Sequence, residues 1–228
     1  MFFIRKQGNY YKVKGRYVKL DYGAESPFIN AMNNARSIIG NVNDLQDKIK
    51  GLDYLINLIE EDLCSDVGAD YVYLKNGERI DLFFPAQAED DTGTSITSAS
   101  DDIITVDVSR VHIYTSPRNS IRIAKLINDN LPSDIIESTN YSIYYPELNL
   151  LYAADNNNHK LSIMATRGQG KVKCKKYYVE RLYPYLSTNG EYWIKKHSNE
   201  RLSTTDFRLP IIYSLAKWRY GLRHNIKF

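Results

Sequence analysis

The stretch FINAMNNARSIIGNVNDLQDKIKGLDYLINLIEEDL, residues 28–63, carries apolar or small side chains at alternating spacings of three and four residues. These positions are Phe28, Ala31, Ala35, Ile38, Val42, Leu45, Ile49, Leu52, Ile56, Ile59 and Leu63. Such spacing is typical of the seam along which an α-helix packs on a neighbour. Ser26 and Pro27, an N-cap residue followed by a proline at the first helical position, indicate where the helix begins.

The length of this helix has two interpretations. One continuous helix over these 36 residues would measure about 54 Å, whereas a compact chain of this size has a radius of gyration of about 17 Å. A break at Gly40-Asn41 would instead give an αα-hairpin with helices Ser26–Ile39 and Asn43–Cys64. The unbroken register favours one helix, and the cluster of glycine and asparagine favours two.

Between Gly40 and Gly51 the apolar seam is narrow and has charged residues around it. The other helices that we predict are short, so we expect a second copy of this chain, or another protein, to cover the seam. The predicted subunit interface consists of Ile38, Val42, Leu45, Ile49, Leu52 and Ile56. Packing of the same side chains in the core of their own subunit is the alternative.

Length and composition restrict the class of protein. The chain has 228 residues, enough to bury a real core. No run approaches the eighteen or so apolar residues of a membrane span, so we expect no membrane contact. The two cysteines, Cys64 and Cys174, match neither a disulfide framework nor a zinc pattern, which favours synthesis in a reducing compartment. Nineteen tyrosines and nineteen asparagines give a composition bias that is common where the coding DNA is AT-rich.

Charge is divided unevenly along the chain. Residues 1–20 carry six basic residues and no acidic one, residues 21–159 carry nine basic and 23 acidic, and residues 160–228 carry 15 basic and four acidic. The near-neutral total of +3 therefore hides an acidic middle between two basic ends. Such polarity suits head-to-tail contacts between copies, or an anionic partner for the basic end, unless folding brings the opposite charges together within one subunit.

The expected fold class is α+β, with a long N-terminal helix or αα-hairpin, a mostly antiparallel β body and a C-terminal helix that starts near Pro210. We divide the chain into a basic β-meander arm (1–25), the helix or helical hairpin (26–66) and an α+β body whose last third is basic (67–228). A helix is predicted over Ile121–Asn130, a long loop over residues 86–102, and a hairpin at Asn189-Gly190. Further strands are predicted at Phe2–Arg5, Tyr10–Val13, Arg16–Leu20, Tyr71–Lys75, Glu78–Phe84, Ile103–Thr115, Tyr141–Tyr145, Leu148–Ala153 and Leu161–Thr166.

A basic strand follows the glycine-rich turn after Arg167. With a period of two, Lys171, Lys173 and Lys175 share one face, while Lys176 and several tyrosines follow. Lysines interleaved with aromatic residues can follow a phosphate backbone and stack on bases, so Arg167, Lys171, Lys173, Lys175 and Lys176 are the candidate anion or nucleic-acid contacts. An edge strand protected from aggregation by its lysines is the alternative.

Signs of chemistry are missing from the sequence. The four histidines, His112, His159, His197 and His224, are isolated, and none belongs to a metal-binding or catalytic motif. We therefore expect that the protein is not an enzyme and that it binds no cofactor, metal or small-molecule substrate. The expected function is a non-enzymatic structural subunit of a large assembly, and the kind of assembly that we favour is the virion of a tailed bacteriophage, with the protein at the head-tail connector, neck ring or tail. Its partners would be copies of itself and other assembly proteins, with DNA as a further candidate; a cytoplasmic nucleic-acid-binding protein that uses residues 160–228 is the alternative.

Overall fold

The computed structural model of the chain describes residues 10–13, 16–19, 26–73, 83–115, 125–126, 135–137, 142–153, 158–204 and 206–228. It has the expected α+β class, and six of the nine strand pairings in this part of the chain are antiparallel. The predicted strand Phe2–Arg5 and most of the predicted helix Ile121–Asn130 lie outside the described residues. The described helices contain no stretch that is both long and apolar enough to cross a membrane.

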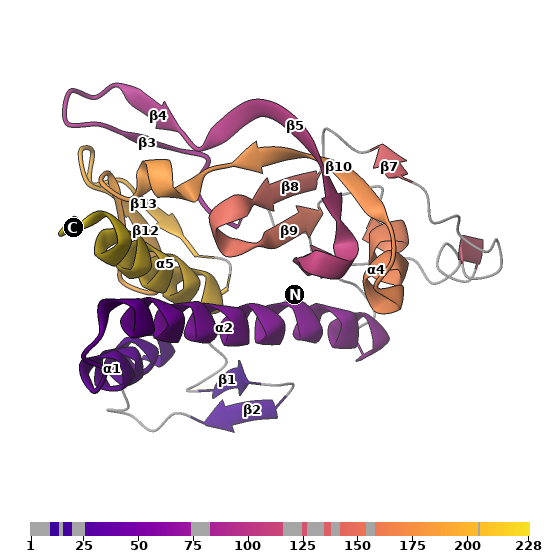
Figure 1. Cartoon of the computed structure of the whole chain (residues 1–228), viewed down its shortest axis with the longest axis horizontal. Helices are drawn as coiled ribbons and strands as arrows, with labels where there is room; N and C mark the ends of the chain where they lie inside the picture. Colours follow the sequence, from indigo (N-terminus) through magenta and orange to yellow (C-terminus); the bar gives the residue numbers. More distant parts are fainter. Residues whose placement is uncertain are drawn as a thin grey trace. The chain divides into compact units, whose positions relative to one another are not determined.

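The chain forms two compact units, and each is discontinuous in sequence. The sheet unit contains residues 61–82 and 99–178, and the helical unit contains residues 2–60, 83–98 and 179–228. Figure 1 follows the chain through both units by colour. The strands β1 (Tyr10–Val13) and β2 (Arg16–Lys19) pair with each other as an antiparallel hairpin, as their sequence predicts.

Residues 28–63, which carry the apolar seam, fold into two helices, so the αα-hairpin is the correct interpretation. Helix α1 (Pro27–Gly40) begins at Ser26, whose hydroxyl accepts a hydrogen bond from the backbone of Ile29 at 3.3 Å. Helix α2 (Leu45–Tyr73) begins after Asp44, whose carboxylate accepts from the backbone nitrogens of Gln46 and Asp47. The Asp44 cap, rather than the predicted Asn43, therefore ends the connection and starts the second helix.

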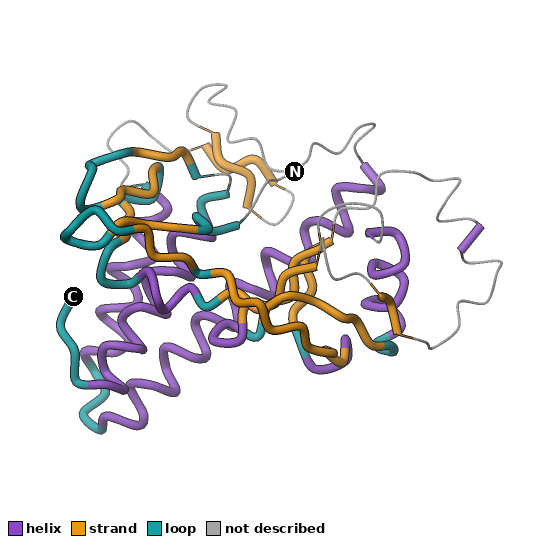
Figure 2. The backbone as a smooth tube through the Cα atoms, turned by 90° about the horizontal axis from the view of Figure 1, so that it is seen from above, coloured by secondary structure: helices purple, strands orange, loops and turns teal. Residues whose placement is uncertain are grey.

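In the helical unit, α1, the part of α2 that ends at Glu60, and α5 (Arg208–His224) lie side by side in both views (Figures 1 and 2). A Cβ atom added at Gly51 would lie 2.7 Å from Cδ1 of Ile39, so α1 and α2 approach closely there. On α5, Arg219 and Arg223 both bind the carboxylate of Asp53 on α2. Arg219 is therefore a packing residue of this helix pair.

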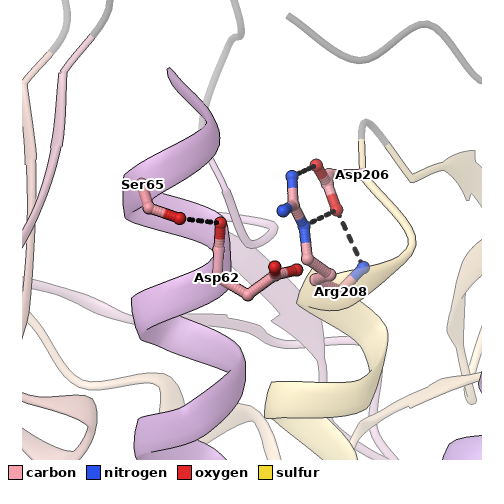
Figure 3. Close-up of polar contacts among 4 residues, drawn as sticks. All are labelled: Asp62, Ser65, Asp206 and Arg208. Carbon is pink, nitrogen blue, oxygen red and sulfur yellow. Dashed lines mark hydrogen bonds and ion pairs between the residues drawn. The ribbon is translucent and has the colours of Figure 1, made fainter. Parts of the chain in front are cut away.

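Helix α5 starts at a buried ion pair, which Figure 3 shows in close-up. The Asp206 carboxylate accepts from the backbone nitrogen of Arg208 at 2.9 Å, and also from Nε and Nη2 of the Arg208 guanidinium at 3.0 and 2.7 Å. Both side chains are at most 3% exposed. The same carboxylate thus caps the helix and neutralises a buried arginine.

Aromatic side chains form the centre of the helical unit. Phe84 and Trp193 both contact Tyr213, with ring centroids 6.3 and 5.2 Å from it, and Tyr183 lies 5.3 Å from the same ring. Trp193 and Tyr183 pack edge-on against Tyr213, and edge-on packing adds to the gain from burial. The surrounding strands are β3 (Gln87–Glu89), β4 (Ser95–Thr97), β11 (Leu186–Thr188), β12 (Tyr192–Lys195) and β13 (Arg201–Ser203).

The sheet unit contains a sheet of strand order β5-β10-β8-β9-β6, with β7 also paired to β10. Its elements are β5 (Ala99–Asp107), β6 (His112–Thr115), β7 (Ile135–Glu137), β8 (Ser142–Tyr145), β9 (Leu150–Ala153), α4 (Asn158–Arg167) and β10 (Lys171–Tyr177). One face of this sheet packs on α4 through an apolar core that includes Val172, Cys174, Leu161 and Met164.

Three predicted elements are wrong. Residues 71–73 continue α2 instead of starting a strand, because the preceding helix overrides the β propensity of tyrosine and valine. Residues 161–166 belong to helix α4, since Leu161 and Met164 point into the core at helical spacing. The expected loop at 86–102 contains the β3–β4 hairpin, whose turn is closed by hydrogen bonds to the Asp90 carboxylate from the backbone nitrogens of Thr92 and Thr94.

Candidate functional site

The most prominent surface feature of the described helical unit is an apolar groove along α5. Its volume is about 770 Å³, within the range of ligand and peptide sites. The apolar side chains that line it are Leu45, Tyr213, Trp218, Leu222, Ile226 and Phe228. Leu45, Ile226 and Phe228 are 47%, 44% and 47% exposed, so this part of the lining is open to solvent, whereas Tyr213 is buried. We call these six residues the groove patch.

The C-terminal residues reach the groove because α5 ends in a sharp reversal. Asn225 adopts a left-handed conformation with φ of 54°, and the backbone nitrogen of Ile226 donates to the carbonyl oxygen of Gly221 at 2.9 Å. A Cβ atom at position 221 would lie 2.6 Å from the Ile226 carbonyl oxygen, so only glycine fits this contact. The Phe228 ring then packs within 6.1 Å of the Tyr183 and Tyr220 rings.

One lysine lies partly buried in the groove wall. Nζ of Lys217 donates to the carbonyl oxygen of Leu186 at 3.0 Å and lies 4.8 Å from the centre of the Phe228 ring. Burial, with a smaller contribution from the charge of Lys196, lowers the pKa of Lys217 to about 8. Lys227 also lines the groove, and none of the described residues that line it is acidic. The groove therefore combines an apolar floor with two lysine side chains.

The predicted subunit interface is divided by the fold. Ile38 and Leu45 are 46% and 47% exposed, and Val42 is partly exposed. Ile49, Leu52 and Ile56 are 7%, 0% and 1% exposed, because other parts of the same chain cover them. The prediction that these three residues lie at the surface is wrong: this side of α2 packs within its own subunit. Of the predicted set, Leu45 alone lines the groove.

A second exposed surface lies on α2 and was missed from the sequence. Tyr54 is 65% exposed and Leu58 is 46% exposed, one helical turn apart. The exposed Glu61 follows Leu58 at a spacing of three on the same continuous helix. Tyr54 and Leu58 are not among the apolar seam positions between Phe28 and Leu63. Their absence from that pattern is the sequence signal that could have distinguished them from core residues. We call Tyr54, Leu58 and Glu61 the α2 stripe.

The basic strand β10 is central in its sheet, and not an edge strand. It pairs with β5 on one side and with β7 and β8 on the other, so protection of an edge does not explain its lysines. Lys171, Lys173 and Lys175 share one face, as predicted, while Val172 and Cys174 are fully buried on the other. Lys171 is exposed, and Lys173 and Lys175 are partly exposed.

The surroundings of these lysines are mixed in charge. Asp107 is the register partner of Lys171, and its pKa is lowered by hydrogen bonds from Ser109 and, to a smaller extent, by the charge of Lys171. Lys176 forms an ion pair of 3.7 Å with Asp102. Arg167, at the end of α4, is exposed. Lys171, Lys173 and Lys175 thus form a row of positive charge on one face of β10, which Asp107 of β5 partly neutralises, and this row does not include Lys176 or Arg167.

A family model described as a family of unknown function, DUF6710, matches residues 7–226. The chain belongs to this family. No curated protein and no solved structure gives a significant match.

Metal-binding and thiol side chains are a further feature of the described part of this DUF6710 chain. Its His, Cys, Asp and Glu side chains form no group of three or more that could hold a metal ion. Burial raises the pKa of the Cys174 thiol to about 12, so the thiol is protonated at neutral pH and belongs to the core. The groove and the α2 stripe are therefore the candidate binding surfaces.

Proposed function

We propose that this DUF6710 protein is a non-enzymatic structural subunit of a multimeric assembly, in which the groove patch is a contact surface between copies of the chain. One observation carries this proposal. Leu45, Ile226 and Phe228, which come from distant parts of the sequence, converge on a single groove and remain nearly half exposed there. Isolated exposed apolar residues are ordinary, whereas a contiguous apolar surface is typical of an interaction site.

The distribution of exposed apolar side chains supports the same proposal. Among the described residues, eight of the nine large hydrophobic side chains that are exposed belong to the helical unit. Burying the exposed part of a leucine or phenylalanine contributes on the order of 1 kcal/mol. Several such residues in one interface would therefore supply much of the affinity of a stable contact.

The kind of assembly is a further part of the proposal. We favour a virion component of a tailed bacteriophage, at the head-tail connector, the neck ring or the tail, where other assembly proteins would be its partners. The support is the compositional bias toward tyrosine and asparagine and the separation of an acidic middle from two basic ends, which suits contacts between repeated copies.

Self-association of the purified chain tests the proposal. We expect light scattering coupled to size-exclusion chromatography to give a mass above 26.4 kDa that rises with protein concentration. Leu45→Asp should weaken the association at least tenfold, since it places a charge in the groove patch. Ile103→Asp is the matched control, because Ile103 is 53% exposed and belongs to the sheet unit. A wild-type chain that stays monomeric at all concentrations would refute the proposal.

A second candidate function, nucleic-acid binding, is favoured by the shared face of Lys171, Lys173 and Lys175. Replacing all three by glutamate should abolish binding of a fluorescent single-stranded oligonucleotide and leave the oligomer unchanged. Binding by the wild-type chain should fall steeply with salt, because the affinity comes from displaced counterions. An oligonucleotide affinity that is insensitive to salt, or unchanged in the triple variant, would contradict this candidate.

A further inference from the structure

The α2 stripe and the groove patch differ in shape and charge, and this difference suggests how copies are arranged. The groove is concave and apolar, and it contains Lys217 and Lys227 without an acidic side chain among the described residues that line it. The stripe is on the convex surface of a helix, with Tyr54 and Leu58 in adjacent turns and the acidic Glu61 after them. The groove is therefore a concave apolar surface with two lysines, and the stripe is a convex apolar surface followed by a carboxylate.

We infer that the groove patch of one copy receives the α2 stripe of a second copy. An amphipathic helix that inserts side chains one turn apart into an apolar groove is a recurring mode of recognition. Tyr54, at 65% exposure, would be the main anchor, because tyrosine buries a large area and loses little conformational entropy. The inference rests on the proposed function, since it specifies which surfaces meet when copies associate.

Charge sets the orientation of the contact. Glu61 would face the lysines of the groove, and a carboxylate beside a partly buried ammonium group offsets part of the desolvation of the lysine. Of the two groove lysines, Lys217 gains the most stabilisation of its charged form from a nearby carboxylate, since burial already lowers its pKa to about 8 in the single chain. A groove that met another groove would instead bring lysine against lysine, which disfavours a symmetric groove-to-groove dimer.

A contact between two different surfaces does not close after two copies. Each subunit keeps one free groove and one free stripe, so association continues until a ring closes or a filament forms. The contact is therefore heterologous, and this property separates it from a two-fold symmetric dimer in which the same patch meets itself. A mixing experiment can detect the difference directly.

The test uses one variant with a damaged groove and one with a damaged stripe. Leu45→Asp disables the groove and keeps the stripe, whereas Leu58→Asp disables the stripe and keeps the groove. Each variant alone should be monomeric. An equimolar mixture should form a 1:1 dimer, because one intact groove can still receive one intact stripe. Native mass spectrometry, with one variant isotopically labelled, identifies the composition of the dimer.

The outcomes are distinct. A wild-type chain that associates, together with a mixture that stays monomeric, overturns this inference and leaves the proposed function intact. A wild-type chain that stays monomeric refutes both. Tyr54→Ser and Ile226→Asp provide an independent stripe and groove variant if either aspartate variant fails to fold by circular dichroism. Charge reversal tests the orientation. Lys227→Glu and Glu61→Lys, each alone, should weaken association several-fold, and the double variant should recover it. A double variant that does not recover association would contradict the proposed orientation.

Discussion

The substitution Glu60→Gln tests whether the helical unit carries a protonated carboxyl group. Glu60 is on α2 and is completely inaccessible to solvent. Burial raises the pKa of its carboxyl group from 4.5 to about 9, although the charge of Arg219 acts in the opposite direction. The carboxyl group is therefore protonated in the folded protein at neutral pH and ionised in the unfolded chain.

The sign of the pH effect follows from the protons bound in each state. Between pH 4.5 and about 9 the folded protein holds a proton that the unfolded chain has released, so the unfolding free energy falls as the pH rises through this range. Each pH unit is worth 1.36 kcal/mol, which gives a loss of about 3 kcal/mol between pH 4.5 and 7. Glutamine keeps the shape of the protonated carboxyl group and does not ionise, so Glu60→Gln should avoid this loss.

Tryptophan fluorescence is a suitable probe because Trp193 and Trp218 both belong to the helical unit and are the two tryptophans of the chain. Urea titrations at pH 5, 6, 7 and 8 should give Glu60→Gln an advantage over the wild type that grows by up to about 1.4 kcal/mol per pH unit. An advantage that does not change with pH, or a variant that is less stable than the wild type at pH 7 and above, would refute the reasoning.

Two further predictions concern single residues of the fold. Asp206→Asn should lower the stability of the helical unit by about 1.5–3 kcal/mol, because it replaces the carboxylate that accepts two hydrogen bonds from the buried Arg208 guanidinium by a neutral amide. The control Asp47→Asn, which removes an exposed ion pair, should cost less than about 1 kcal/mol, and equal costs in urea titrations followed by tryptophan fluorescence would contradict the burial argument. Gly170→Ala should destabilise the sheet unit by about 1–3 kcal/mol, since Gly170 has φ of 124° and an added Cβ would lie 1.9 Å from Cε of Met164. Amide hydrogen exchange in β10 measures this loss, and unchanged protection would refute it.

Much of the fold could be predicted from local patterns. Ser26 and Pro27 start α1, the Asn189-Gly190 turn joins β11 to β12, and Lys171 to Lys175 alternate between the two faces of β10. The failures have physical causes. The apolar residues of α4 fit a strand as well as a helix over a few residues, and the position of β10 in the centre of its sheet depends on pairings between distant segments.

The candidate site was less predictable than the fold. Leu45 was predicted as an interface residue, but its partners Ile226 and Phe228 lie about 180 positions away, and only the reversal at Asn225 brings them to the groove. Leu52 and Ile56 fit the three- and four-residue spacing of the seam as well as Leu45 does. Periodicity alone therefore cannot tell which part of a seam the same chain will cover.

The two faces of α2 explain why the chain is expected to need a partner. Leu52 and Ile56 are buried, whereas Tyr54 and Leu58, each two residues further along, are exposed. Two residues turn a helix by about 200°, so Tyr54 and Leu58 lie on the side opposite to the buried pair. A helix with apolar residues on both sides has more apolar surface than a single packing contact covers. The subunit covers one side of α2, and the opposite side is the one that we assign to the groove of a second copy.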